Sequence, residues 1–167
     1  MSNLEETQKK TVNWLQITTI ALVAIVLVWL GWRVFFPDSP TIFAGSPPES
    51  LGIEEGKLTP CPSTPNCVSS KSEDLEHYIE PLVYEGDGIT RLKELITQQP
   101  RTRIIAESDN YLYAQFTSQW LGFVDDVEFY LNPSEAGVIE VRSTSRLGES
   151  DLGVNRKRIE TLRELLR

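Results

Sequence analysis

The fold class is most clearly predicted by residues 101–146, which read RTRIIAESDNYLYAQFTSQWLGFVDDVEFYLNPSEAGVIEVRSTSR. The stretch holds four runs that are rich in β-branched and aromatic residues, at positions 102–108, 111–118, 123–131 and 138–144. Such runs are typical of strands, and short turn sequences such as that at Asp109 and Asn110 separate them. Because short turns join antiparallel neighbours, the stretch predicts a four-stranded antiparallel meander.

An amphipathic helix is expected on each side of this meander. Residues 86–100 and 151–166 both place apolar side chains at helical spacing, and Pro100 ends the first segment. Asp87 and Ser150 are the candidate N-caps. The apolar faces consist of Ile89, Leu92, Leu95 and Ile96 in the first segment and Leu152, Ile159, Leu162 and Leu166 in the second. The predicted fold class is α+β, a sheet of about four strands with two helices packed on one face.

The N-terminal part of the chain carries an uncharged run, TVNWLQITTIALVAIVLVWLGW, at residues 11–32. A helix of that length crosses a hydrocarbon core about 30 Å thick. A cleaved signal is the alternative, but its apolar region is usually about 7 to 15 residues long. We therefore expect a transmembrane helix over residues 11–35, after a tail of residues 1–10. Lys9 and Lys10 precede the run and only Arg33 follows it closely, so the positive-inside rule predicts a cytoplasmic N-terminus.

The remaining chain is then expected across the membrane, in the periplasm, a lumen or the cell exterior. Residues 36–57 are rich in proline, glycine and serine and show no period, which predicts a mobile linker before a domain of residues 58–167. The whole chain has 16 basic and 24 acidic residues and a net charge of −8. An acidic chain is poorly suited to phosphate backbones, so no nucleic-acid partner is expected.

Both cysteines lie in TPCPSTPNCVSS, residues 59–70. In an oxidising compartment two cysteines in a turn-rich loop usually form a disulfide. The six-residue separation and the intervening prolines allow Cα atoms to come within about 4.4 to 6.8 Å. We predict a disulfide between Cys61 and Cys67. Free or regulatory thiols are one alternative, and a metal site completed by His77 and carboxylates is another. Neither a cofactor nor a metal is predicted.

Paired carboxylates occur in FVDDVEFYL, residues 123–131. The alternation of a strand puts Asp125 on the apolar face, and it puts Asp126 and Glu128 on the opposite face. A carboxylate on the core side needs a partner, since an unpaired buried charge is very costly. Arg142 is the strand-borne cation expected to pair with Asp125. A structural ion pair is favoured, and the alternative is a pair of carboxylates, Asp125 and Asp126, that act as general acid and base or as ligands.

Basic and hydroxyl side chains gather in residues 142–158. Arginine and hydroxyl groups beside a helix N-terminus bind anions, so this region is a candidate ligand or partner site. Asp151 argues against an anion there, because it already occupies the positive end of the helix dipole. The candidate residues are Arg142, Ser143, Ser145, Arg146, Asp151 and Asn155. No catalytic motif occurs, and His77 is expected to be exposed or to cap the core.

Three blocks, PCPSTPNCVSS, FVDDVEFYL and VRSTSRLGESDLGVNRKRIETL, together resemble the uncharacterised DUF1499 family. Its members carry a Cys-Pro…Pro-Asn-Cys-Val-Ser-Ser block, a Phe-x-Asp-Asp-Val-Glu-Phe strand and an Arg-Ser-x-Ser-Arg-x-Gly…Asp-x-Gly-x-Asn block. The resemblance covers about residues 58–167. The family occurs in bacterial envelopes and in plastid-bearing lineages, so the resemblance implies a cyanobacterial or similar member of an envelope or thylakoid membrane. It implies no known activity.

We therefore expect a single-pass, membrane-anchored domain in the periplasm or thylakoid lumen. Its expected function is to bind a partner protein or a small anionic envelope ligand. The alternative is an enzyme, a hydrolase or isomerase, whose site joins Asp125 and Asp126 to the loop of residues 142–155. Carboxylates that are fully paired with arginines would weaken the enzyme hypothesis, and a polar cleft with unpaired groups would favour it.

Overall fold

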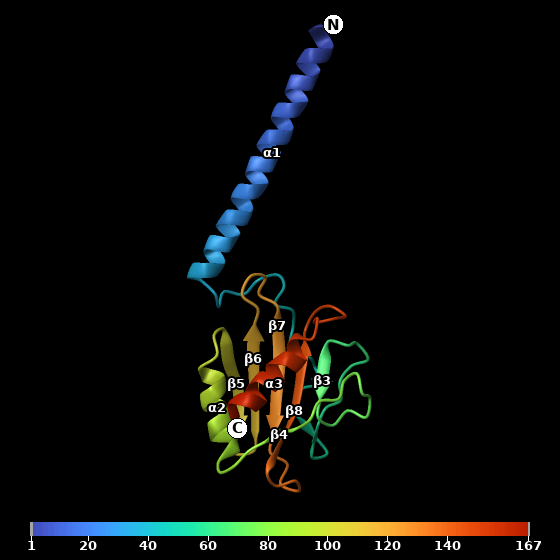
Figure 1. Ribbon diagram of the computed structural model, residues 1–167, viewed down its shortest axis with the longest axis vertical. Helices are drawn as coiled ribbons and strands as arrows, with labels where there is room; N and C mark the ends of the chain where they lie inside the picture. Colours follow the sequence, from blue (N-terminus) through green and yellow to red (C-terminus); the bar gives the residue numbers. More distant parts are fainter. Residues whose placement is uncertain (1, 167) are drawn as a thin grey trace. The chain divides into compact units, whose positions relative to one another are not determined.

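The computed structural model describes residues 2–166 of the chain, and their side chains from residue 13 onward. It consists of two compact units, Met1–Ser39 and Pro40–Arg167. Helix α1 (Ser2–Phe35) makes up most of the first unit (Figure 1). Its segment Asn13–Phe35, with a mean hydropathy of 2.1, is long and apolar enough to cross a membrane, a test that a signal sequence also passes. The side chains of Lys9 and Lys10, on which the predicted orientation rests, lie outside the described residues.

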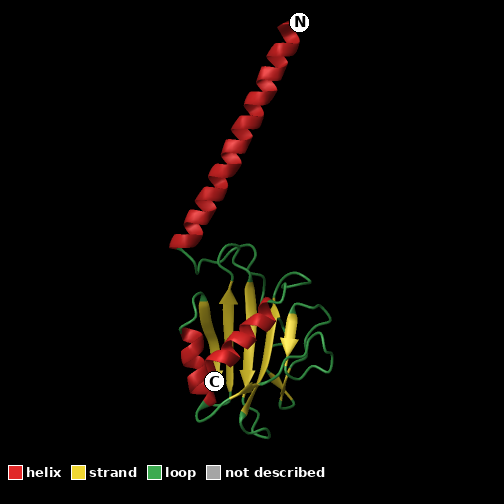
Figure 2. Ribbon diagram, in the orientation of Figure 1, coloured by secondary structure: helices red, strands yellow, loops and turns green. Residues whose placement is uncertain are grey.

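The second unit is α+β, as predicted, and every pair of neighbouring strands is antiparallel (Figure 2). The predicted meander is confirmed as β5 to β8, with strand ends that shift by one residue at most. The four strands are β5 (Thr102–Ser108), β6 (Tyr111–Thr117), β7 (Val124–Tyr130) and β8 (Val138–Ser145).

The sheet has more strands than the sequence predicts. Strands β3 (Cys67–Ser69) and β4 (Leu82–Val83) both pair with β8 and extend the sheet to six strands. A separate two-stranded sheet joins β1 (Ile53–Glu54) and β2 (Lys57–Leu58). These strands contain only two or three residues, which is too short for an alternating pattern to be recognised.

Helices α2 (Gly88–Thr97) and α3 (Val154–Leu166) begin differently. The predicted cap of α2 is confirmed, because the Asp87 carboxylate accepts a hydrogen bond from the Thr90 amide at 3.1 Å. The predicted cap of α3 is wrong: Asp151 accepts from the amides of Gly153 and Asn155 at 2.9 and 2.8 Å, and Ser150 lies further upstream. Leu152, expected on the apolar face of this helix, instead precedes it and is 94% exposed, and both Leu152 and Gly153 have a positive φ before α3 starts.

Both helices pack on the same face of the sheet, which we call the helix face (Figure 1). The register places Leu112 of β6, Phe129 of β7 and Val141 of β8 side by side, and all three are fully buried. The core on this face also contains Leu92 and Ile96 of α2 and Ile159 and Leu162 of α3.

The opposite face of the sheet is covered by residues 45–58, which we call the covering segment. Its backbone contacts the sheet through Ser50 and Gly52, which bind the side chains of Arg142 and Glu128. Leu58 is 3% exposed, and β2 contacts both β7 and β8. The stretch expected to be a mobile linker, residues 36–57, is therefore part of the folded domain from Pro40 onward.

Candidate functional site

The residues singled out by the sequence lie together, but the pleat of the sheet divides them between two faces. Asp125 points to the helix face, where it is opposite Ser145 of β8. Asp126 and Glu128 point to the covered face, where Glu128 is opposite Arg142. Asp125 and Asp126 therefore cannot converge on one substrate atom as an acid and base pair, since neighbouring strand residues face opposite ways.

On the helix face, Asp125 belongs to a hydrogen-bonded cluster that joins β7, β8 and α3. Its carboxylate accepts from Arg158 at 2.5 Å and from the Ser145 hydroxyl at 2.6 Å. The Asn155 amide nitrogen donates to Ser145 Oγ at 2.9 Å, and the Asn155 oxygen accepts from Ser143 at 2.5 Å and from Arg158 at 2.7 Å. The predicted pairing of Asp125 with Arg142 is wrong, because Arg142 extends from the other face of β8.

On the covered face, Arg142 forms a buried ion pair with Glu128. The two side chains are 2% and 0% exposed, and Arg142 Nη1 lies 2.8 Å from Glu128 Oε2. The Glu128 carboxylate also accepts from the Gly52 amide at 2.6 Å and from the Tyr111 hydroxyl at 2.8 Å. Burial, together with the adjacent Glu128 charge, raises the pKa of the Tyr111 phenol, which keeps the phenol protonated as a donor.

A second ion pair on the covered face joins Asp126 and Arg146. Arg146 donates from Nε and Nη2 to the two carboxylate oxygens at 2.7 and 2.8 Å, and this contact raises the pKa of the guanidinium. The Tyr113 hydroxyl donates to the same carboxylate at 2.5 Å, and Gln115 donates to Tyr113. Burial, followed by the Asp126 hydrogen bond, raises the pKa of Tyr113. Each of the three carboxylates of β7 thus has its own arginine.

Two buried polar atoms among the described side chains have no hydrogen-bond partner, Arg142 Nε and Glu140 Oε2. The other carboxylate oxygen of Glu140 accepts from Asn132 at 2.7 Å and lies 3.1 Å from Lys71 Nζ. Among the residues from 13 to 166, no three histidine, cysteine or acidic side chains are grouped closely enough to hold a metal ion.

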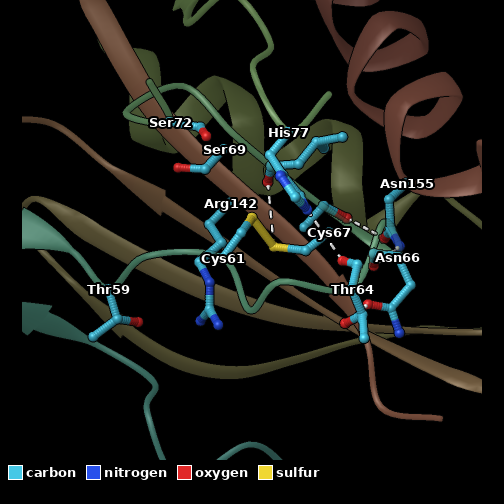
Figure 3. The surroundings of a disulfide bond; sticks show 12 residues. Thr59, Cys61, Thr64, Asn66, Cys67, Ser69, Ser72, His77, Arg142 and Asn155 are labelled. Atoms are coloured by element: carbon cyan, nitrogen blue, oxygen red, sulfur yellow. Dashed lines mark hydrogen bonds between the residues drawn. A yellow bond between two sulfur atoms is a disulfide. The ribbon is translucent and has the colours of Figure 1, made fainter. Parts of the chain in front are cut away.

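The two cysteines form the predicted disulfide, with Cα atoms 5.7 Å apart (Figure 3). Cys67 begins β3, and Asn66 before it attaches the loop to the end of β8. The backbone oxygen of Asn66 accepts from the Ser145 backbone amide at 3.0 Å and from the Asn155 side chain at 3.0 Å. The side-chain amide of Asn66 donates to the Gly148 backbone oxygen at 2.6 Å. The disulfide loop therefore contacts the cluster on the helix face.

His77 closes the other side of the disulfide loop (Figure 3). The residue is 6% exposed, and its ring lies with Nδ1 at 2.8 Å from Asp74 and Nε2 at 3.2 Å from the Thr64 backbone oxygen. Burial opposes a charge on the ring, but these hydrogen bonds outweigh it and raise the pKa of His77. Both ring nitrogens are engaged, which fits the expected capping role.

A cavity of about 380 Å³, which we call the loop cavity, lies between the disulfide loop, the covering segment and the end of β8. Arg142 and Arg146 line it, but their charges are already balanced by Glu128 and Asp126.

A second cavity, of about 460 Å³, lies on the helix face between the start of β5, the end of β6 and α3. We call it the helix-face cavity. The Phe116 ring lines it, with the Arg158 guanidinium 4.7 Å from the ring centroid. Arg101 and Lys157 also line it and form no ion pair with any described side chain. Reasoning from the sequence did not select Arg101 or Phe116, because neither stands near the motifs.

The fold and site define a disulfide-linked α+β domain with charged layers on both sheet faces, preceded by an apolar helix. A family model described as "Protein of unknown function (DUF1499)" matches residues 57–166, and the chain belongs to this family. A comparison with curated proteins and one with solved structures give no match.

Proposed function

We propose that this protein is a single-pass membrane protein whose domain lies in the periplasm or thylakoid lumen and binds a small ligand. The segment Asn13–Phe35, uncharged as far as Trp32, has the length and hydropathy of a membrane anchor. The disulfide between Cys61 and Cys67 supports an oxidising compartment for the domain, since disulfides are rare in the cytosol. With Lys9 and Lys10 before the uncharged run of residues 11–32 and only Arg33 close after it, the charge balance favours a cytoplasmic N-terminus.

The state of the carboxylates favours binding over acid and base catalysis. A general acid or base needs a proton that it can exchange with a substrate. Asp125, Asp126 and Glu128 are at most 8% exposed, and each is held by an arginine and by at least one hydroxyl group. Such groups are arranged as structural ion pairs rather than as free reactive groups.

The observation that carries the proposal is the helix-face cavity. Its volume of about 460 Å³ falls within the range of about 300 to 1,000 Å³ that is usual for ligand sites. Phe116 and Leu162 supply an apolar wall, and Lys157 and Arg101 supply unbalanced positive charge in a chain whose net charge is −8. The ligand that fits this chemistry has an apolar body and one anionic group.

The backbone of Arg101 is consistent with a functional role for this wall. Its φ of 57° lies in the left-handed region, which costs a residue other than glycine about 1 to 3 kcal/mol. The Arg101 oxygen accepts from the Thr117 amide at 2.9 Å and its Nε donates to the Thr117 oxygen at 3.3 Å, so the side chain is held beside the cavity.

The test is to titrate the full-length protein in lipid nanodiscs with 4-phenylbutyrate and with its uncharged amide, by isothermal calorimetry. The acid should bind more tightly than the amide. A charge-assisted hydrogen bond is worth about 1.5 to 3 kcal/mol, so Lys157→Gln should weaken binding of the acid by about tenfold or more. Lys57→Gln is the matched control, because Lys57 is also exposed and lies outside this cavity. Equal binding of acid and amide, or equal effects of the two variants, would refute this site.

A further inference from the structure

The end of the sheet at which β6 turns into β7 carries an exposed apolar surface. The exposed fractions are 87% for Ile42, 49% for Trp120, 45% for Leu121, 37% for Phe123 and 41% for Leu147. We call these five residues the apolar tip. They come from three segments: the start of the domain, the β6–β7 hairpin and the loop after β8. Figure 1 shows the β6–β7 and β8–α3 loops at the same end of the sheet.

The apolar tip is held in place by specific contacts. The Thr41 hydroxyl donates to the Leu121 oxygen at 2.8 Å, which ties the start of the domain to the hairpin. The Phe43 and Phe123 rings lie 5.3 Å apart, and Ser118 and Phe123 close the hairpin through a backbone hydrogen bond of 2.8 Å. The exposed side chains therefore project from an ordered turn.

The length of the chain limits how far this tip can be from the anchor. The candidate span ends at Phe35, and Thr41 follows six residues later. Six extended residues reach about 20 Å. The opposite end of the sheet, where Val83 pairs with Val138, is separated from the tip by the eight residues of β8, or about 25 Å more. For an anchor that ends at Phe35, this short connection favours the apolar end of the sheet as the end nearer to a bilayer.

We propose that the apolar tip docks into the interface of the same bilayer that holds the anchor, which rests on the anchor proposed above. Tryptophan favours the headgroup level of a membrane, and aliphatic side chains favour the adjoining acyl boundary. Trp120 would lie at the headgroup level, and Ile42 and Leu121 would lie at the acyl boundary. The contact is apolar, so it does not require anionic lipid. Thr117 and Ser118 line the helix-face cavity, which docking places beside the lipid headgroups.

The experiment uses tryptophan fluorescence in phosphatidylcholine vesicles that contain brominated lipid. The chain has four tryptophans, so replacing Trp14, Trp29 and Trp32 by phenylalanine leaves Trp120 alone. Interfacial side chains reach about 5 to 10 Å into the bilayer, so bromines at shallow acyl positions should quench Trp120 more strongly than deep ones. Leu121→Glu in this background should greatly reduce the quenching, because it places a charge among lipid tails.

Two further chains make the result decisive. In one, all four native tryptophans are replaced by phenylalanine and Val83→Trp places a single tryptophan at the far end of the sheet. This tryptophan should not be quenched. The other keeps only Trp29, inside the span. If Trp29 is quenched and Trp120 is not, docking is overturned while the anchor stands. If neither is quenched, the anchor is refuted and docking with it.

Discussion

Replacing Arg142 by methionine should destabilise the domain strongly, because it leaves the Glu128 carboxylate buried without its cation. Glu128 is 0% exposed, and it would keep only the hydrogen bonds from the Gly52 amide and the Tyr111 hydroxyl. Removing one partner of a buried ion pair costs about 3 to 5 kcal/mol. For a domain of this size 1 kcal/mol corresponds to about 4 °C, so Arg142→Met should lower the Tm by about 12 to 20 °C.

The double variant Arg142→Met with Glu128→Gln separates the charge from the loss of packing. A neutral amide can occupy the same space and still accept from Gly52 and Tyr111, so the double variant should recover about 2 kcal/mol of the loss. Thermal unfolding of the full chain in nanodiscs, followed by circular dichroism, measures both changes. Arg91→Met is the control, because its ion pair with Glu94 is exposed and should contribute less than about 1 kcal/mol.

A loss below about 1 kcal/mol in Arg142→Met would refute the reasoning, since it would show that Glu128 does not depend on its arginine. A double variant that is no more stable than Arg142→Met would refute it as well. In that case the destabilisation would come from lost packing of the long Arg142 side chain rather than from an unpaired charge.

Three further predictions concern the disulfide, the histidine and the topology. Replacing Cys61 and Cys67 by serine should cost about 2 kcal/mol without preventing folding, because the loop that the disulfide closes is short; two alkylatable thiols in unreduced native protein would contradict the disulfide. The raised pKa of His77 means that its protonated form adds stability below about pH 6.5, and that this stability is lost as the pH rises through the folded-state pKa. His77→Gln should remove this part of the Tm dependence on pH, and an unchanged profile would contradict it. A reporter that is active only in the cytoplasm, fused after Arg167, should be silent, and an active fusion would overturn the proposed compartment.

The meander and both helices could be predicted because their patterns are local and long enough to be recognised. Each of β5 to β8 is a run of seven or eight residues bounded by short turns, and Asp87 marks the start of α2. The covering segment could not be predicted. Its prolines and glycines resemble a linker, and its attachment depends on backbone groups of Ser50 and Gly52 that bind distant side chains. A sequence pattern does not show which backbone groups will meet a buried charge.

The sequence predicted that the carboxylates of residues 123–131 form ion pairs with arginines, but which residues pair depends on the strand register. From the sequence we predicted that Asp125 pairs with Arg142. In the observed register Glu128 lies opposite Arg142, and Asp125 lies opposite Ser145. Because neighbouring residues alternate between faces, an offset of one residue sends a side chain to the wrong side of the sheet. Arg158 then reaches Asp125 from α3, a contact that no pattern within β7 or β8 reveals.

The three sequence blocks of the family meet because β8 lies between the other two. Strand β3, which follows the disulfide loop, pairs with one edge of β8, and β7 pairs with the other. Asn66 and Asn155 bind the end of β8, and the carboxylates of β7 pair with Arg142 of β8, with Arg146 just after β8 and with Arg158 of α3.

Most of the block residues are thus occupied in holding the charged sheet together, and their loss should appear first as a loss of stability. The side chains with unbalanced charge, Arg101 and Lys157, lie at the helix-face cavity, and Arg101 and the cavity's Phe116 stand outside the blocks. It follows that ligand specificity should be sought at this cavity, where block residues such as Lys157 meet Arg101 and Phe116 from outside the blocks.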